Sequence, residues 1–270
     1  MYRLRCAFVL LTFPLLTAFL QAQDTQSTPA KSTSAATSPA KAAAPAKDVD
    51  PLALKVVNYV ADPVEKAQAF TFKALVSEEE LATDGQIVTF FHSVNVAVQR
   101  PDKIHLTFRG RGQRVDFYTA NGSTTMYAPD VKLYTTLPAK NTIDAIISDV
   151  NAKGIDMPIG PFLRSDLYEL ISKAVTTGYV IGRVNVNDQE VTQLAFTAPD
   201  ADFQLWVTGG DTPRFVRVEV VNKKLEGKPR TAIQFLDWDL NPTLSSDEFT
   251  FTKPADAMQI STLPGMGGKQ

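Results

Sequence analysis

The chain has 270 residues, of which 44% are apolar, 21% charged and 9% aromatic, so it can bury a substantial core. This composition excludes a chain disordered throughout and a disulfide-stapled miniprotein. With 27 Lys and Arg against 29 Asp and Glu, it lacks the positive field that draws proteins to nucleic acid, and we expect no nucleic-acid partner. Its single cysteine, Cys6, lies near the N-terminus, which excludes disulfides and thiolate metal sites from the rest of the chain.

The N-terminal segment has the pattern of a secretory signal peptide. Two arginines precede an apolar run over residues 7–20, and Ala22 offers a small residue at a cleavage site. The run is shorter than the roughly 20 residues of a membrane span and contains Pro14. We therefore predict a cleaved signal peptide over residues 1–22, export to the periplasm and no stable membrane span after cleavage. An uncleaved membrane anchor is the alternative.

The next segment, residues 23–49, should be a linker. Of its 27 residues, 22 are Ala, Pro, Ser, Thr or Lys, and none is aromatic. Such a segment cannot bury enough apolar surface to order itself, so we predict a disordered linker ahead of a folded domain at 50–254. The glycine-rich end of the chain predicts a flexible tail over 255–270.

The first part of the folded domain combines one helix with a run of strands. A short amphipathic helix is expected from Asp50 to about Val60, because Asp caps helices well and Pro51 suits a first helical position. Apolar residues then alternate with polar ones, a period of two that indicates half-buried strands. These strands are predicted at 69–77, 86–99, 104–108, 115–117, 124–127 and 131–137.

The second part begins with two helices and ends with strands. Apolar residues recur at helical spacing over 142–153 and 161–174. After Gly178 the alternation resumes, and Phe249–Phe251 is expected as a closing strand. The strands between them are predicted at 179–186, 191–198, 203–207, 214–221 and 230–238.

The short connections between successive strands favour an antiparallel meander over parallel βαβ units. A sheet of about eleven strands curls because strands twist, and one of its faces must be covered. We therefore predict a mainly β (α+β) fold, a curved antiparallel half-barrel of about eleven strands whose concave face is covered by helices. Such a shape either fills its interior with side chains or keeps a cavity for a hydrophobic ligand.

Strand alternation and helix periodicity predict which side chains face this interior. The candidate lining of a hydrophobic cavity consists of Phe70, Phe72, Phe90, His92, Phe108, Phe117, Ile143, Ile147, Phe162 and Leu167. A closed core made of the same side chains is the alternative, since packed interiors are the norm. His92 is expected as a hydrogen-bonded core residue rather than a metal ligand or general base, and His105 as a surface residue.

The sequence contains no recognisable catalytic or metal-binding motif. It has no H-E-x-x-H, no G-x-S-x-G and no Walker loop, so we expect no enzyme, no metal and no cofactor. The acidic run Glu78–Glu80 is expected as a solvated hairpin tip rather than a cation site. A charged, solvent-facing strand edge is expected from Arg100, Arg109, Arg111 and Arg114, with contact to an acidic partner or a lipid headgroup as the alternative.

Several short segments resemble a family of predicted bacterial periplasmic proteins of unknown function. In chain order they are Leu133–Pro138, Thr142–Asp144, Gly154–Pro158, Gly178–Gly182, Gln204–Val207, Asp211–Pro213 and Asp237–Leu240. The resemblance spans about residues 50–254. It implies a fold similar to that of the outer-membrane lipoprotein carriers, and to that of a sensor domain that binds lipid and misfolded outer-membrane protein.

Together these observations predict a non-catalytic periplasmic binding or carrier protein for a hydrophobic ligand, such as a lipid, an acyl chain or a lipidated peptide. The alternative is an envelope protein-interaction or stress-sensing module with a closed core, no ligand and an envelope protein as its partner. The sequence motifs do not decide between the two.

Overall fold

The computed structural model describes residues 47–153, 155 and 157–261, so the predicted signal peptide and nearly all of the predicted linker lie outside the described residues. Within this part the chain forms one 13-stranded sheet in the order β1-β8-β9-β10-β11-β12-β2-β3-β4-β5-β6-β7-β13. The strands are β1 (Asp48–Val49), β2 (Ala69–Leu81), β3 (Ile87–Gln99), β4 (Lys103–Gly110), β5 (Gln113–Ala120), β6 (Ser123–Ala128), β7 (Leu133–Pro138), β8 (Thr177–Val186), β9 (Gln189–Thr197), β10 (Ala201–Val207), β11 (Phe215–Asn222), β12 (Arg230–Asp239) and β13 (Met258–Gln259). The helices are α1 (Pro51–Lys66), α2 (Ile143–Ala152), η1 (Gly160–Leu163), α3 (Leu167–Ala174) and η2 (Ser246–Phe249), where η denotes a 3-10 helix.

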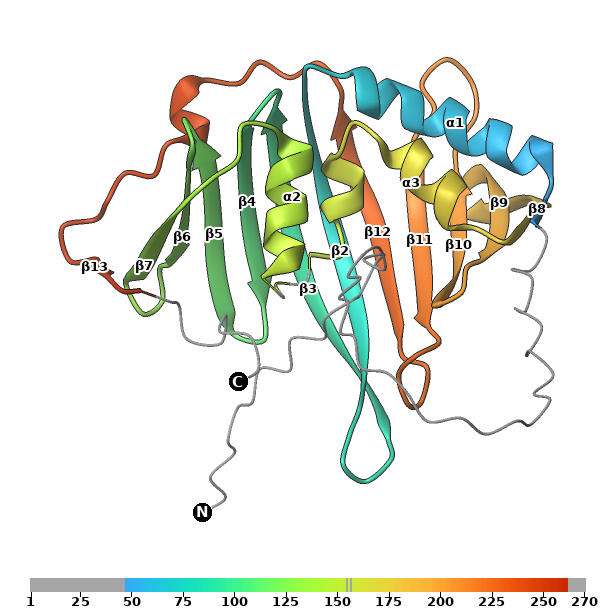
Figure 1. Cartoon of the computed structure of the whole chain (residues 1–270), viewed down its shortest axis with the longest axis horizontal. Coiled ribbons are helices and arrows are strands. Elements are labelled where there is room, and N and C mark those ends of the chain that lie inside the picture. Colours follow the sequence, from blue (N-terminus) through green and yellow to red (C-terminus); the bar gives the residue numbers. More distant parts are fainter. Residues whose placement is uncertain (1–46, 154, 156, 262–270) are drawn as a thin grey trace, which may run out of the picture.

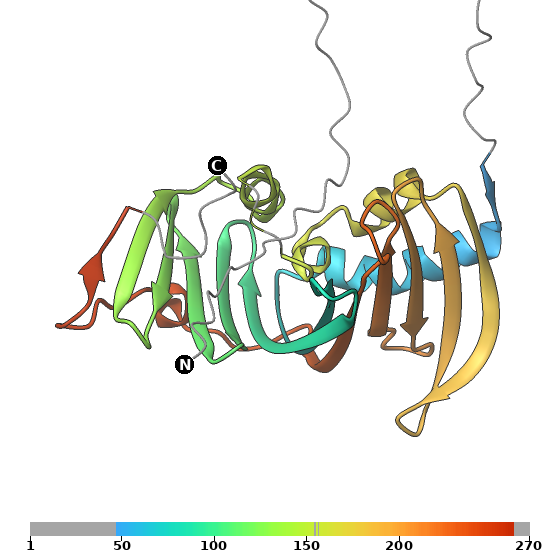
Figure 2. The same cartoon turned by 90° about the horizontal axis from the view of Figure 1, so that it is seen from below.

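The sheet consists of two antiparallel meanders, β2–β7 and β8–β12, joined edge to edge by the pairing of β12 with β2. Figure 1 shows α2 in front of the first meander and α1 and α3 in front of the second. Turning the molecule (Figure 2) shows the sheet strongly curved, with the helices on the inner side of the curve. This arrangement confirms the predicted curved antiparallel half-barrel with a helix-covered concave face.

Helix α1 is longer than the sequence predicts. The Asp50 side chain caps it by accepting a hydrogen bond from the backbone N–H of Leu52 at 2.8 Å. The helix continues beyond the expected end near Val60, through Pro63, and ends at Lys66. Proline removes one backbone donor, but the buried stripe extends to Val64, so packing holds the last turn in place.

Two predicted elements differ in the structure. The helix expected over 161–174 is divided into η1 and α3, with residues 164–166 between them. The strand expected at Phe249–Phe251 is replaced by η2 and an extended segment on the outer face of the sheet. There the ring of Phe251 packs on outward-facing tyrosines, with ring centroids 5.8, 5.2 and 5.1 Å from those of Tyr118, Tyr127 and Tyr134. An aromatic contact with one sheet face has therefore replaced strand pairing.

The sheet also extends beyond the predicted domain boundaries of 50–254. The two-residue strand β1 pairs in parallel with the start of β8, and β13 pairs in parallel with β7. Both outermost strands are thus supplied by the segments predicted as linker and tail. None of the described helices is long and apolar enough to cross a membrane.

Gly178 in β8 lies against the ring of Phe196 in β9, its direct cross-strand partner. A Cβ atom at this position would lie 2.3 Å from Cδ1 and 2.6 Å from Cε1 of Phe196. We expect Gly178→Ala to lower the free energy of unfolding by about 1–3 kcal/mol, because the ring is packed and must move. Urea unfolding checks this. Gly209→Ala is the control, since nothing lies within 4 Å of the position that its Cβ atom would take, and equal midpoints for the two variants would contradict the prediction.

Candidate ligand-binding interior

The predicted lining residues do come together on the concave side, but most of them form a closed core. Seven are no more than 5% exposed, namely Phe70, Phe72, Phe117, Ile143, Ile147, Phe162 and Leu167. The other three, Phe90, His92 and Phe108, are half-buried. In this conformation the ten side chains therefore do not surround one open cavity.

An aromatic cluster fills the space under η1. The ring of Phe162 meets Phe215 and Phe235 edge to face, with centroids 5.2 and 4.8 Å apart. Trp238 lies against Phe72 with centroids 4.3 Å apart, and its indole N–H donates to the carbonyl of Phe215 at 3.0 Å. Trp238 therefore packs against the concave core and is hydrogen-bonded to the neighbouring strand β11.

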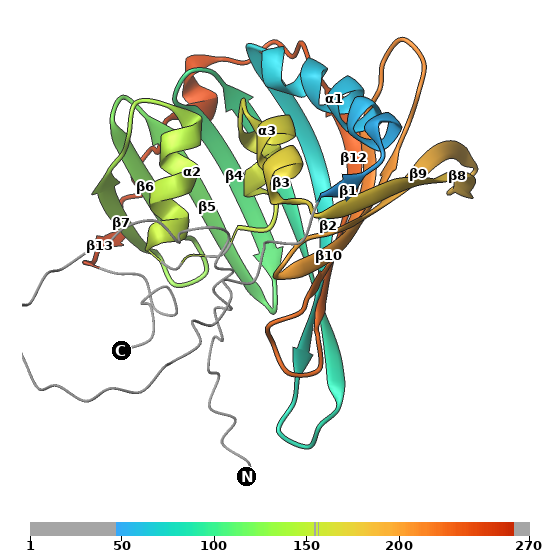
Figure 3. The same cartoon turned by 45° about the vertical axis from the view of Figure 1, so that its right-hand side comes forward.

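The ends of β2 and β3 protrude from the sheet as a two-stranded ribbon, which is clearest in Figure 3. On its inner side the guanidinium of Arg111 lies 3.6 Å above the ring of Phe90, and Glu80 pairs with Arg111. His92 Nδ1 lies 3.7 Å from a carboxylate oxygen of Glu78. The glutamates are thus strand residues with partners, and the solvated hairpin tip predicted for Glu78–Glu80 is wrong.

His92 lies on the apolar face of β3 as predicted, but it is half-buried rather than a core residue. Burial is the larger cause and the positive charge of Arg111 the smaller cause of a pKa below the ordinary histidine value. Its imidazole is therefore neutral at pH 7. The other histidine, His105, is not a plain surface residue, because its ring stacks on Tyr118 and its Nδ1 lies 2.8 Å from Glu248 Oε1.

A small cleft lies between α2 and the inner face of β5–β7, and we call it the α2 cleft. Its lining residues are Phe117, Thr124, Met126, Leu137, Pro138, Ala139, Lys140, Ile146, Asp149, Val150, Lys153 and Ile155. Its enclosed space is about 20 Å³, which holds about one water molecule. Phe117 is the one predicted lining residue among them, so this cleft lies beside the predicted cavity rather than within it.

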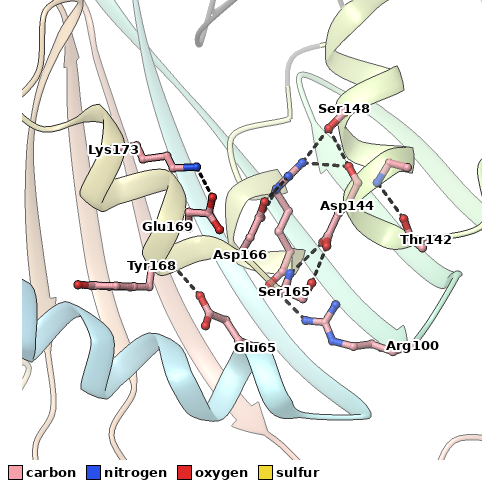
Figure 4. A network of polar contacts seen from close by, with 12 residues as sticks. Glu65, Arg100, Thr142, Asp144, Ser148, Ser165, Asp166, Tyr168, Glu169 and Lys173 are labelled. Carbon is pink, nitrogen blue, oxygen red and sulfur yellow. Dashed lines mark hydrogen bonds and ion pairs between the residues drawn. The ribbon is translucent and has the colours of Figure 1, made fainter.

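Polar contacts fasten the helices to one another and to the sheet at one end of the layer (Figure 4). Arg100, at the end of β3, donates from Nε to the carbonyl of Ala67 at 3.1 Å. Its Nη2 donates to the carbonyls of Val64 at 3.3 Å and Arg164 at 3.2 Å. One guanidinium therefore ties the end of α1 and the end of η1 to the sheet. Burial lowers the pKa of Arg100 below its ordinary value, while Asp144 and Glu65 oppose this shift.

A second arginine joins α2 to α3. Arg164 donates from Nη1 to the carbonyl of Asp144 at 2.9 Å and to the hydroxyl of Ser148 at 2.8 Å, both in α2. Its other nitrogens bond both carboxylate oxygens of Asp166, at 2.6 and 2.7 Å. The Asp144 carboxylate in turn accepts the backbone N–H of Ser165 at 2.8 Å. The first turn of α2 is thus held by residues between η1 and α3.

We expect the Arg164–Asp166 pair to make this junction sensitive to acid. The hydrogen bonds from Arg164 hold the pKa of Asp166 below its ordinary value. The stability from a lowered aspartate pKa is present above the unfolded value of about 3.9 and is lost as pH falls through the folded value. We expect the difference in unfolding free energy between wild type and Asp166→Asn, at most about 1 kcal/mol for a partly exposed pair, to shrink in that window. Urea unfolding at several pH values checks this, and a difference that grows toward acid would contradict it.

Sequence reasoning placed Arg100 in a charged strand edge and gave no role to Arg164 or Asp144. Only the residue types could have indicated these contacts, because the acceptors of Arg100 are backbone carbonyls that lie 33 to 64 residues away in the sequence. Among the described residues, no group of three or more His, Cys, Asp or Glu side chains is placed to hold a metal ion. The concave side of the sheet thus carries buried apolar side chains, and polar contacts of Arg100 and Arg164 hold the helices that cover them.

Three solved structures illustrate what the fold is similar to. Lipoprotein LppX from Mycobacterium tuberculosis is 12% identical with a TM-score of 0.48, and the match covers 73% of this chain and 100% of LppX. LprF from Mycobacterium bovis is 14% identical with a TM-score of 0.45, covering 78% and 100%. A LolA superfamily protein from Nitrosomonas europaea is 11% identical with a TM-score of 0.32, covering 74% and 97%. Since these TM-scores are below 0.5, the fold assignment rests on the strand order and curvature described above.

No curated protein matches the chain. The sequence pattern of one family, described as predicted periplasmic protein (DUF2092), matches residues 53–263, nearly the whole described domain. This match confirms the resemblance drawn from the short segments. The chain belongs to the DUF2092 family of predicted periplasmic proteins.

Proposed function

We propose that the protein is a non-catalytic binding or carrier protein for a hydrophobic ligand, such as a lipid, an acyl chain or a lipidated peptide, and that it needs no cofactor. It would reach the periplasm by a cleaved signal peptide over residues 1–22, followed by the linker. The description of its family as predicted periplasmic supports this location. An apolar concave face under a separate helical layer supports the binding role.

The observation that carries the proposal is the way the helical layer is attached. Its apolar side chains pack on the sheet, while Arg100 and Arg164 hold its parts together from one end. Moving helices away would break these polar contacts and expose the apolar side chains beneath them, but it would not unpair any strand. The closed core seen here would then be the ligand-free state, with the core side chains as the surface that a ligand covers.

Binding of a fluorescent fatty acid to the delipidated mature protein tests this function. We expect saturable binding that unlabelled fatty acid competes away. The reason is that burying apolar surface of the ligand contributes about 25 cal/mol per Å² of favourable binding free energy. Ile146→Trp, which fills the α2 cleft, should weaken binding, whereas Leu236→Trp on the opposite sheet face should not. Circular dichroism shows whether both variants are folded. Absence of saturable binding to the folded wild type would overturn the proposal.

A second function, an envelope protein-interaction module, is favoured by an exposed apolar stripe on the convex face. Leu75 in β2 lies opposite Ser93 and Gln234, which makes Phe91 and Leu236 its diagonal neighbours on the same face. The three side chains are 44%, 61% and 45% exposed. A photo-crosslinking residue at Phe91 would capture a reproducible envelope protein in cells if this function holds, and none if it does not.

A further inference from the structure

Resting on the function proposed above, we propose that the α2 cleft takes an amphiphile with an anionic head, such as a free fatty acid. The head would contact Lys140 and Lys153, and the apolar chain would lie between α2 and the inner faces of β5 and β6. This assigns both the ligand chemistry and its position, which the family match leaves open.

The lining of the α2 cleft divides into an apolar floor and a cationic rim. Phe117 and Met126 form part of the floor from the sheet, and Val150 faces them from α2. Lys140 lies in the connection between β7 and α2, while Lys153 caps the other end of the helix. A ligand that matches this division has one apolar end and one polar end.

The charges at the rim favour an anion. Lys153 bonds the carboxylate of Asp149 one turn earlier in α2, with Nζ 2.6 Å from Oδ2. Within the described part of the chain, no ion pair involves Lys140. The rim therefore carries two ammonium groups and one carboxylate, a net positive charge. The carbonyl end of α2 repels an anion, so the head should approach the lysine side chains rather than the helix terminus.

The enclosed space holds about one water molecule, so an acyl chain requires α2 to move. The first turn of α2 is anchored, because Ile143 donates its backbone N–H to the carbonyl of Pro101 at 2.8 Å and the Asp144 carboxylate bonds Ser165. At the other end, the hydrogen bonds found among the described residues, from the backbone N–H groups of Lys153 and Ile155, go to carbonyls of α2 itself. Beyond Ser148, which accepts a hydrogen bond from Arg164, no hydrogen bond found among the described residues joins α2 to another helix or strand, so its last turn has the weaker polar attachment.

The test compares a fluorescent fatty acid with its uncharged methyl ester on the folded mature protein. We expect the wild type to bind the acid about tenfold more tightly than the ester, since a charge-assisted contact adds to the same apolar burial. The double variant Lys140→Gln/Lys153→Gln should bind both probes equally, with ester binding unchanged. Lys66→Gln is the matched control, because Lys66 also pairs with an aspartate one turn earlier, in α1, and should leave the preference intact.

The outcomes separate this inference from the proposed function. If neither probe binds the wild type saturably, the proposed function fails and the inference fails with it. If both bind with equal affinity, or if the double variant keeps the preference for the acid, the inference fails while hydrophobic binding stands. Ala139→Phe, which places a ring in the cleft, checks the position, because unaltered binding to this folded variant would locate the ligand elsewhere.

Discussion

Replacing Phe162 by alanine is expected to lower the free energy of unfolding by about 3–5 kcal/mol, the largest stability loss that we predict for a single substitution. Phe162 is 5% exposed, and it connects η1 to the sheet through edge-to-face contacts with Phe215 and Phe235. Removing its ring leaves a space bounded by these side chains and by the short helix. The helical layer would lose one of its apolar contacts with the second meander.

Phe91→Ala is the matched control, since it removes the same ring from a site that is 61% exposed on the convex face. Its expected effect is within about 0.5 kcal/mol, as for most surface substitutions. Urea unfolding of both variants measures the difference. A small effect of Phe162→Ala would mean that the interior relaxes easily around the missing ring, and that the helical layer is less firmly packed than the aromatic contacts indicate.

The position of Phe162 shows what the sequence could predict. The helical spacing of the apolar residues predicts that Phe162 faces the interior, and the structure confirms that its side chain is buried. The single helix predicted over 161–174 is wrong because residues 164–166 leave the helical path, where Arg164 bonds the carboxylate of Asp166 and groups of α2. Contacts of this kind depend on segments about 20 residues away, and local periodicity contains no information about them.

The same limit applies to the candidate site. Alternation correctly predicted that Phe70, Phe72 and Phe117 face inward, because the side-chain period of a strand is local. Whether inward-facing side chains close on one another or leave a space depends on how the helices seat against a curved sheet. In the structure the helices lie so that the α2 cleft is beside the predicted cavity, against β5–β7, while the aromatic side chains under η1 pack against one another.

Arg100 gives the second large expected effect, because one side chain donates to three carbonyls that lie 33 to 64 residues away in the sequence. The carbonyl of Val64 belongs to the last turn of α1, where carbonyls have no partner within the helix, and Ala67 follows that turn. A cation there also interacts favourably with the helix dipole. Arg100→Met is expected to lower the free energy of unfolding by about 2–3 kcal/mol, since these acceptors lose their donor.

Arg100→Lys should recover only part of this loss, because an ammonium group lacks the planar fork that spans three acceptors. Arg109→Met, on the exposed part of the neighbouring strand β4, is the control and should be neutral. Hydrogen exchange should show faster opening in the last turn of α1 for the Met variant, and stopped-flow mixing should show faster uptake of the fluorescent fatty acid. Unchanged exchange and unchanged uptake would mean that Arg100 supports the fold without controlling the helical layer, and the mobile-layer explanation of ligand access would then fail.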